Sequence, residues 1–209
     1  MGQIKNIIFD LGGVIINLDI PKTISEFNKL SNQPFESIYN QLQQTPVFDL
    51  FDKGQITEKD FFVELKKALR NDVTDEELLF AWNAMLLDFP KHRLELLSKL
   101  KPNYRLFLLS NTNESHVLEF EKTLFASHGY QNLEPFFEKV YYSCRMNQRK
   151  PNADIFESVL NENNLIAEQT LFIDDSPQHV EGALTLGVKA MLLEKNNEVE
   201  DLLKELKLI

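Results

Sequence analysis

The sequence predicts an α/β protein, with a Rossmann-like three-layer core around a parallel sheet and a bundle of helices inserted after the first strand. In the second half of the chain, short apolar runs alternate with helix-length segments, as in parallel sheets whose strands are joined by helices. Residues 21–90, in contrast, have a helical pattern throughout. A length of 209 residues fits one domain that carries a smaller insert.

Five short runs rich in Ile, Leu, Val, Phe or Tyr are the expected strands. They are Ile4–Phe9, Arg105–Ser110, Lys139–Ser143, Thr170–Ile173 and Val188–Leu193. The expected helices of the core are Asn113–Phe125, Asn152–Leu160, Pro177–Leu186 and a terminal helix within Asn196–Ile209. Their ends carry the usual signals, such as Asn113 as an N-cap and Gly187 after a helix that begins with proline.

The insert shows apolar residues at helical spacing. Three groups share a face: Ile24, Phe27 and Leu30; then Phe61, Phe62, Leu65 and Leu69; then Leu78, Leu79, Trp82 and Leu86. Turn-forming residues at 31–34, 52–54 and 71–74 separate about four helices. We therefore assign residues 1–18 and 91–209 to the core and residues 19–90 to the helical insert.

Composition and charge limit the partners. A formal net charge of −10 argues against nucleic acid and anionic membranes, since both need a basic face. No apolar run approaches the length of a membrane span. The single cysteine, Cys144, and the lack of a signal-peptide pattern lead us to expect a cytoplasmic protein. The sequence gives no indication of oligomeric state.

Polar groups follow the predicted strands and should meet at one edge of the sheet, because ligands collect at the carboxyl ends of parallel strands. The set comprises Asp10, Ser110, Asn111, Lys150, Asp174 and Asp175. Three close carboxylates repel one another unless a cation lies among them, and oxygen ligands without a His or Cys cluster indicate Mg²⁺. Lys150 and Ser110 suit phosphate oxygens, and Asp10 suits a nucleophile that forms an aspartyl-phosphate.

Four motifs carry a family resemblance: FDLGGV at 9–14, LLSNTN at 108–113, RKP at 149–151 and FIDDS at 172–176. In this order and at these strand ends, they resemble the haloacid dehalogenase superfamily, in the subclass with a helical cap after the first strand. The resemblance covers essentially the whole chain. It is greatest to the bacterial sugar phosphatases that include α-D-glucose-1-phosphatase.

The resemblance implies a Mg²⁺-dependent phosphomonoester hydrolase that acts on a small phosphorylated metabolite, a sugar phosphate. Asp10 would attack phosphorus, and Ser110 and the amide of Asn111 would bind phosphate oxygens. Lys150 would neutralise the phosphate and orient Asp10.

The resemblance also implies a metal site. Asp10 and Asp175 would coordinate Mg²⁺ directly, and Asp174 would do so directly or through water. The main-chain carbonyl of Gly12 would be the remaining protein ligand.

Gly12 is the main departure from the family pattern, because most of these phosphatases carry an acid–base aspartate two residues after the nucleophile. Losing a general acid typically costs about 10²–10⁴ in rate. The substrate could have a better leaving group, or another group such as His116 or a cap residue could supply the proton. Alternatively, the protein binds phosphate ligands or a partner and is catalytically weak.

Two other chemistries of the superfamily stay open. A dehalogenase needs no Mg²⁺, which leaves Asp174 and Asp175 without a purpose. A phosphonatase needs a cap lysine, for which the candidates by location are Lys22, Lys29, Lys53, Lys59, Lys66 and Lys67. Some of Phe48, Phe51, Asp52 and Lys53 could face the substrate, because the turn at 52–54 interrupts the helical pattern. His179 is a further candidate near the site.

Overall fold

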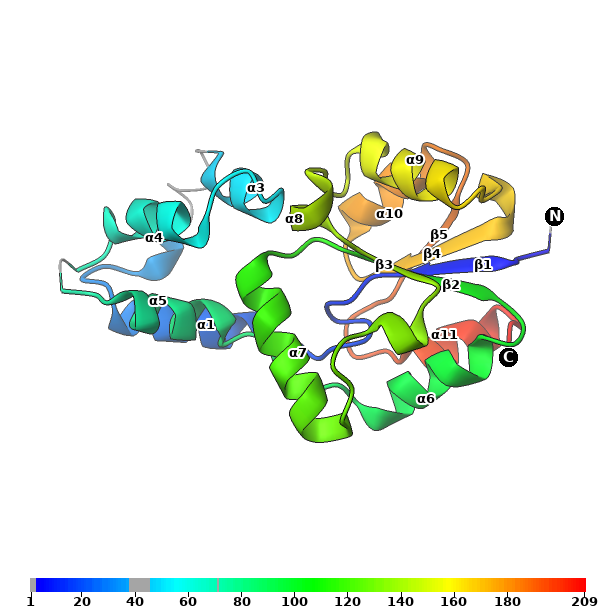
Figure 1. The fold of residues 1–209 in the computed structure, drawn as a ribbon, viewed down its shortest axis with the longest axis horizontal. Helices are drawn as coiled ribbons and strands as arrows, with labels where there is room; N and C mark the ends of the chain where they lie inside the picture. Colours follow the sequence, from blue (N-terminus) through cyan, green and yellow to red (C-terminus); the bar gives the residue numbers. More distant parts are fainter. Residues whose placement is uncertain (1–2, 38–45, 71) are drawn as a thin grey trace.

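The computed structural model describes residues 3–37, 46–70 and 72–209. Its centre is a parallel sheet of five strands in the order β3-β2-β1-β4-β5 (Figure 1). The strands are β1 (Asn6–Phe9), β2 (Arg105–Ser110), β3 (Lys139–Tyr142), β4 (Thr170–Asp174) and β5 (Lys189–Leu192). The predicted sheet is confirmed. One boundary differs in kind: Ser143, expected to end a strand, begins the short helix α8 (Ser143–Met146).

Helices cover both faces of this sheet, which makes the three layers that the sequence predicts (Figure 1). One face carries α9 (Ala153–Glu162) and α10 (Pro177–Leu184), and the other carries α6 (Lys91–Leu100), α7 (Glu114–His128) and α11 (Val199–Glu205). Two short 3₁₀ turns, η1 (Glu134–Phe136) and η2 (Ala167–Gln169), complete this part. Among the described residues, no helix is both long enough and apolar enough to span a bilayer.

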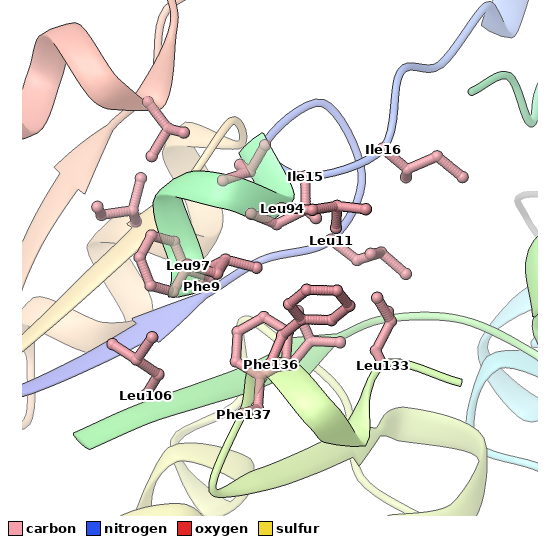
Figure 2. Packing of buried hydrophobic residues seen from close by; sticks show 14 of the residues in the cluster. Phe9, Leu11, Ile15, Ile16, Leu94, Leu97, Leu106, Leu133, Phe136 and Phe137 are labelled. Carbon is pink, nitrogen blue, oxygen red and sulfur yellow. The ribbon is translucent and has the colours of Figure 1, made fainter. Parts of the chain in front are cut away.

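Alternate side chains of the strands enter separate hydrophobic clusters, because successive strand residues point to opposite faces. Ile8 packs with α9 and α10, whereas Ile7 and Phe9 pack with α6, α7 and α11. Figure 2 shows Phe9 beside Leu97 and Phe137 in the second cluster. Burial on both faces explains why β1 reads as a continuous apolar run.

Within the described part of the insert, four helices pack around a third cluster of their own. They are α1 (Ile20–Lys29), α3 (Val47–Asp52), α4 (Glu58–Lys66) and α5 (Asp75–Asn83). Phe61 stacks on Phe51 at 4.2 Å between ring centroids and meets Trp82 edge-on at 4.8 Å. Thr57 and Thr74 form capping boxes that fix where α4 and α5 begin. The insert therefore has its own core beside the sheet (Figure 1).

The two chain segments that join the insert to the sheet pair with each other. The main-chain N–H of Asn17 donates to the carbonyl of Asp88 at 3.0 Å, and that of Asp19 donates to Met85 at 2.8 Å. The side chains of Asn17 and Asp88 also hydrogen bond at 3.0 Å. These contacts place the start and the end of the insert side by side.

Candidate active site

Asp10 is the first residue after β1, at the carboxyl end of the sheet. Its main-chain N–H donates to the carbonyl of Ile173 at 2.9 Å, which continues the register between β1 and β4. Because Phe9 is paired with Ile173, the next residues, Asp10 and Asp174, are neighbours on adjacent strand ends. The buried apolar strand β1 is thus followed by a carboxylate because the carboxyl end of the strand lies at the edge of the sheet where the site is predicted.

Lys150 lies between these two carboxylates and is completely buried. Its Nζ donates to Asp10 Oδ1 at 2.7 Å, to Asp174 Oδ2 at 2.6 Å and to the carbonyl of Leu109 at 2.9 Å. All three N–H donors of the ammonium are therefore used. Burial opposes the charge, but the two carboxylates outweigh it and raise the pKa of Lys150 above its ordinary value. The lysine is a fixed cation at the centre of the site.

Asn111 holds the main chain of Lys150. Its Nδ2 donates to the carbonyl of Lys150 at 2.9 Å, and its Oδ1 accepts from the N–H of Lys150 at the same distance. The peptide bond that follows, Lys150–Pro151, is cis. Both ends of the Asn111 side-chain amide are thus engaged. A phosphate contact from an amide of Asn111 stays a prediction.

Asp174 and Asp175 differ in their surroundings. Asp174 is fully buried and also accepts from the N–H of Ser176 at 2.8 Å and from Nδ1 of His179 at 2.9 Å. Burial acts to raise its pKa, but Lys150 and His179 lower it overall. The Asp175 side chain is exposed, and partial desolvation together with the Asp174 charge raises its pKa. Asp174 is hydrogen-bonded on both oxygens, whereas Asp175 is open to a ligand.

The carboxylates of Asp10, Asp174 and Asp175 form a cluster in which one oxygen from each residue lies within 4.8 Å of the other two. Burial raises the pKa of Asp10 to about 6 although Lys150 lowers it, and the Asp174 charge adds to the rise. One ammonium thus only partly balances three carboxylates. An all-oxygen set with excess negative charge fits a hard divalent cation such as Mg²⁺, as the sequence predicts.

Gly12 and Gly13 lack a side chain for different structural reasons. Gly13 adopts a φ of +69°, and a Cβ built on it would lie 2.5 Å from Oδ2 of Asp175. Only glycine fits this left-handed position against the carboxylate. A Cβ on Gly12 would lie 2.8 Å from Cδ1 of Leu18 and 3.9 Å from Oδ2 of Asp10. Leu18 occupies the space where an acid–base aspartate would begin, and the Gly12 carbonyl as a metal ligand stays a prediction.

Ser110 ends β2 and is buried beside this cluster of strand ends. Within the described residues, its hydroxyl has no hydrogen-bond partner, although it carries one donor and two acceptor positions. A hydroxyl in this state is available to a ligand. Its contact with phosphate oxygens stays a prediction.

His116 and His179, the two histidines considered as candidates near the site, lie in different surroundings. His116 is buried, stacks on Trp82 with ring centroids 5.1 Å apart, and its Nε2 lies 3.2 Å from the carbonyl of Trp82. Burial lowers its pKa to about 4, so the ring is neutral near pH 7 and lacks the acidic proton of an imidazolium. His179, by contrast, belongs to the site through Asp174. No sequence motif links His179 to Asp174, so the sequence alone could place His179 only near the site.

Residues of the insert reach the site's edge through α3. The guanidinium of Arg149 pairs with Asp49 and Asp52 at 3.4 Å each. Lys53 pairs with Asp49 at 2.8 Å, and Phe51 is buried in the insert's core. Of the four residues expected near the substrate, Phe51 is thus a packing residue, and Asp52 is the one beside the loop that carries Lys150.

Comparison with known proteins shows the family to which the chain belongs. The model of the haloacid dehalogenase-like hydrolase family matches residues 7–193. The chain belongs to this family, and the family predicted from the four motifs is confirmed.

Several individual members of the family are similar to this chain over most of its length. The chain is 29% identical to a D-ribitol-5-phosphate phosphatase of Bacteroides thetaiotaomicron over 185 residues, which are 88% of this chain and 89% of the relative. The HAD family enzyme BT-2542 from the same species, solved with magnesium and inorganic phosphate, is 35% identical. Its TM-score is 0.85, with 95% of this chain and 98% of that chain covered. A HAD-like hydrolase from Porphyromonas gingivalis is 32% identical, with a TM-score of 0.85 and 99% of both chains covered.

Proposed function

We propose that this protein is a Mg²⁺-dependent phosphomonoester hydrolase that acts on a small sugar or polyol phosphate through an aspartyl-phosphate on Asp10. One observation carries the proposal: the buried ammonium of Lys150 bridges Asp10 and Asp174 beside the exposed Asp175. A fixed cation and a carboxylate cluster at the carboxyl end of a parallel sheet are suited to a phosphate ester.

Lys150 prepares Asp10 for attack. It engages Oδ1, whereas Oδ2 accepts no hydrogen bond from the described residues. Oδ2 is therefore the oxygen that attacks phosphorus, as the bond from phosphorus to the leaving oxygen breaks. The attack requires the carboxylate, and a pKa of about 6 keeps Asp10 ionised at and above neutral pH.

Asp10, Asp175 and the carbonyl of Gly12 would hold Mg²⁺, with Asp174 contributing directly or through water. When bound, Mg²⁺ would offset the repulsion between the carboxylates and the phosphate and stabilise charge on the phosphoryl oxygens. Ser110 and the main-chain N–H of Asn111 would hold the remaining phosphate oxygens. The relatives solved with magnesium and phosphate support this assignment.

We further propose that residues 19–90 form a cap over a core of residues 1–18 and 91–209. The separate hydrophobic core of the insert and the paired segments near residues 17 and 88 support these boundaries. Such a cap would exclude water and select the substrate. The D-ribitol-5-phosphate phosphatase among the relatives favours a phosphorylated polyol or sugar as the substrate class.

The test is phosphate release from a panel of sugar, polyol and aryl phosphates, with Mg²⁺ and with chelator, for wild type and Asp10→Asn. We expect Mg²⁺-dependent release by wild type and none by Asp10→Asn. A protein that releases nothing but is stabilised against thermal unfolding by sugar phosphates would instead be a binding protein. Gly12 motivates that alternative, since the usual acid is missing.

A further inference from the structure

The proposed reaction needs a proton for a leaving alkoxide, and neither the position of the family's usual acid nor His116 can supply it. Gly12 has no side chain, and Leu18 fills the adjoining space. His116 is neutral and buried, with Nε2 against the carbonyl of Trp82. A protein acid for an alkoxide leaving group therefore has to be a different group near the carboxyl end of the sheet.

Asp52 is the last residue of α3, and its main chain is anchored at this edge. Its carbonyl accepts from the hydroxyl of Ser143 at 2.6 Å. The same hydroxyl oxygen accepts from the N–H of Thr112 at 2.9 Å, two residues after Ser110. Figure 1 shows the end of α3 facing α8, and the two helices are in contact. One hydroxyl thus ties the end of α3 to the loop expected to bind phosphate.

The carboxyl group of Asp52 lies beside the loop of Lys150 and has oxygen atoms that are free to form further hydrogen bonds. Its Oδ2 lies 3.4 Å from the guanidinium of Arg149, the residue before Lys150, and it accepts no hydrogen bond from the described residues. The side chain is 24% exposed, so it is partly desolvated but reachable. The charged groups that act on it are Arg149 and Asp49. Burial raises the pKa of Asp52 to about 6 although Arg149 lowers it, and Asp49 adds to the rise.

We propose that Asp52 is the acid that protonates the leaving group, taking the role that Gly12 cannot fill. The inference rests on the proposed function. In the first step, Asp10 forms a bond to phosphorus, the bond from phosphorus to the substrate oxygen breaks, and the Asp52 proton moves to that oxygen. In the second step, a water oxygen forms a bond to phosphorus, the bond from phosphorus to the Asp10 oxygen breaks, and one water proton moves to the Asp52 carboxylate. Inorganic phosphate and the free Asp10 carboxylate result.

Asp49 is a matched control on the same helix. It also pairs with Arg149, but its carboxylate accepts hydrogen bonds from both Lys53 and Arg149. Although its slight burial acts the other way, these bonds lower the pKa of Asp49. It is an ionised acceptor near pH 7 and has no proton to donate. Asp49→Asn and Asp52→Asn thus remove one carboxylate each from the same arginine.

The experiment measures release of the leaving group in a single turnover with enzyme in excess and Mg²⁺ present. The substrates are D-ribitol-5-phosphate, with an alkoxide leaving group, and p-nitrophenyl phosphate, whose phenolate leaves without a proton. In Asp52→Asn, we expect alkoxide release to slow by roughly 10²–10⁴-fold, as for loss of a general acid, and phenolate release to be unchanged. In Asp49→Asn, both rates should match wild type.

The pH profile gives a second readout that a merely structural role would not move. Asp10 must be ionised and Asp52 protonated, and each has a pKa of about 6, so the wild-type rate on the alkyl ester should pass through a maximum near pH 6 and fall above it as Asp52 ionises. Asp52→Asn should lose this fall, and Asp52→Glu should keep it.

Several outcomes would overturn the assignment. Equal slowing of both leaving groups by Asp52→Asn would mean a structural role, and an unchanged alkoxide rate would mean no role. If Asp49→Asn slowed alkoxide release selectively as well, the slowing would come from loss of negative charge on α3 and not from a proton of Asp52. A wild type that releases neither leaving group, or an Asp10→Asn variant that releases both, would instead overturn the proposed function and this inference with it.

Discussion

At the scale of single residues, the site depends on one buried cation held between two carboxylates. Removing one partner of a buried, hydrogen-bonded ion pair costs about 3–5 kcal/mol, because the remaining charges lose their compensation. Lys150→Met should therefore destabilise the metal-free protein by about this amount in a urea titration and abolish turnover. Asp10→Asn/Lys150→Met should recover part of the stability. A Lys150→Met protein as stable as wild type would show that the pairing is not formed.

Gly12 and Leu18 form a second residue-scale pair. Gly12→Asp places a Cβ 2.8 Å from the end of the Leu18 side chain, so Leu18 must move. Because the atom that must move is the far end of a flexible side chain, we expect a cost at the lower end of the roughly 1–3 kcal/mol typical of overpacking. We expect Gly12→Asp to lower the unfolding midpoint and Leu18→Ala to relieve that strain in the double variant. Equal destabilisation by Gly12→Asp in both backgrounds, measured as a double-mutant cycle, would contradict the packing described.

At the scale of elements, the contact between the insert and the core depends on the turn after α3. Gly54 has a φ of +67°, and a Cβ there would collide with the carbonyl of Cys144 on α8. Gly129, which ends α7 with a φ of +78°, has nothing within 4 Å of its Cβ position. Gly129→Ala should cost only the left-handed backbone strain, about 1–2 kcal/mol. Gly54→Ala should cost clearly more in denaturant unfolding. Equal costs would show that the turn does not contact α8 in solution.

The contact between α5 and α7 should make stability depend on pH through His116. Its pKa in the folded protein is about 4, below its usual 6.5, so the folded state binds fewer protons than the unfolded state between these values. The contribution is complete above pH 6.5 and is lost as pH falls towards 4, amounting to about 3 kcal/mol. His116→Phe should flatten urea-unfolding stability against pH in this window. Identical slopes for variant and wild type would contradict the burial of His116.

The elements of the core follow closely from the sequence, and the contacts between loops do not. Buried parallel strands, such as the one that contains residues 7–9, are recognisable in the sequence as apolar runs. Asn113, an N-cap residue, marks where α7 begins. The amide clamp of Asn111 on Lys150 joins loops 39 residues apart, and Arg149 meets Asp49 100 residues away. Such pairings depend on how loops cross the rim of the sheet, which no local pattern encodes.

At the scale of the whole molecule, a cation site on an acidic protein should couple folding to Mg²⁺. A ligand that binds only the folded state adds about 2.7 kcal/mol at one hundred times its dissociation constant. Thermal unfolding of wild type should therefore shift upward with Mg²⁺, and the shift should be lost in Asp175→Asn. A shift of equal size in Asp175→Asn would place the cation elsewhere. Glu157→Gln, on an exposed carboxylate of α9, is the control for nonspecific charge effects.

The central claim is that phosphate passes through Asp10. The most direct measurement mixes wild type with Mg²⁺ and a labelled sugar phosphate, quenches the reaction in acid at short times, and maps the label on peptides. We predict a transient phosphoryl group on Asp10, within the peptide that contains residues 7–13, and neither label nor phosphate release in Asp10→Asn. Label on another residue, or wild-type phosphate release by Asp10→Asn, would contradict the account.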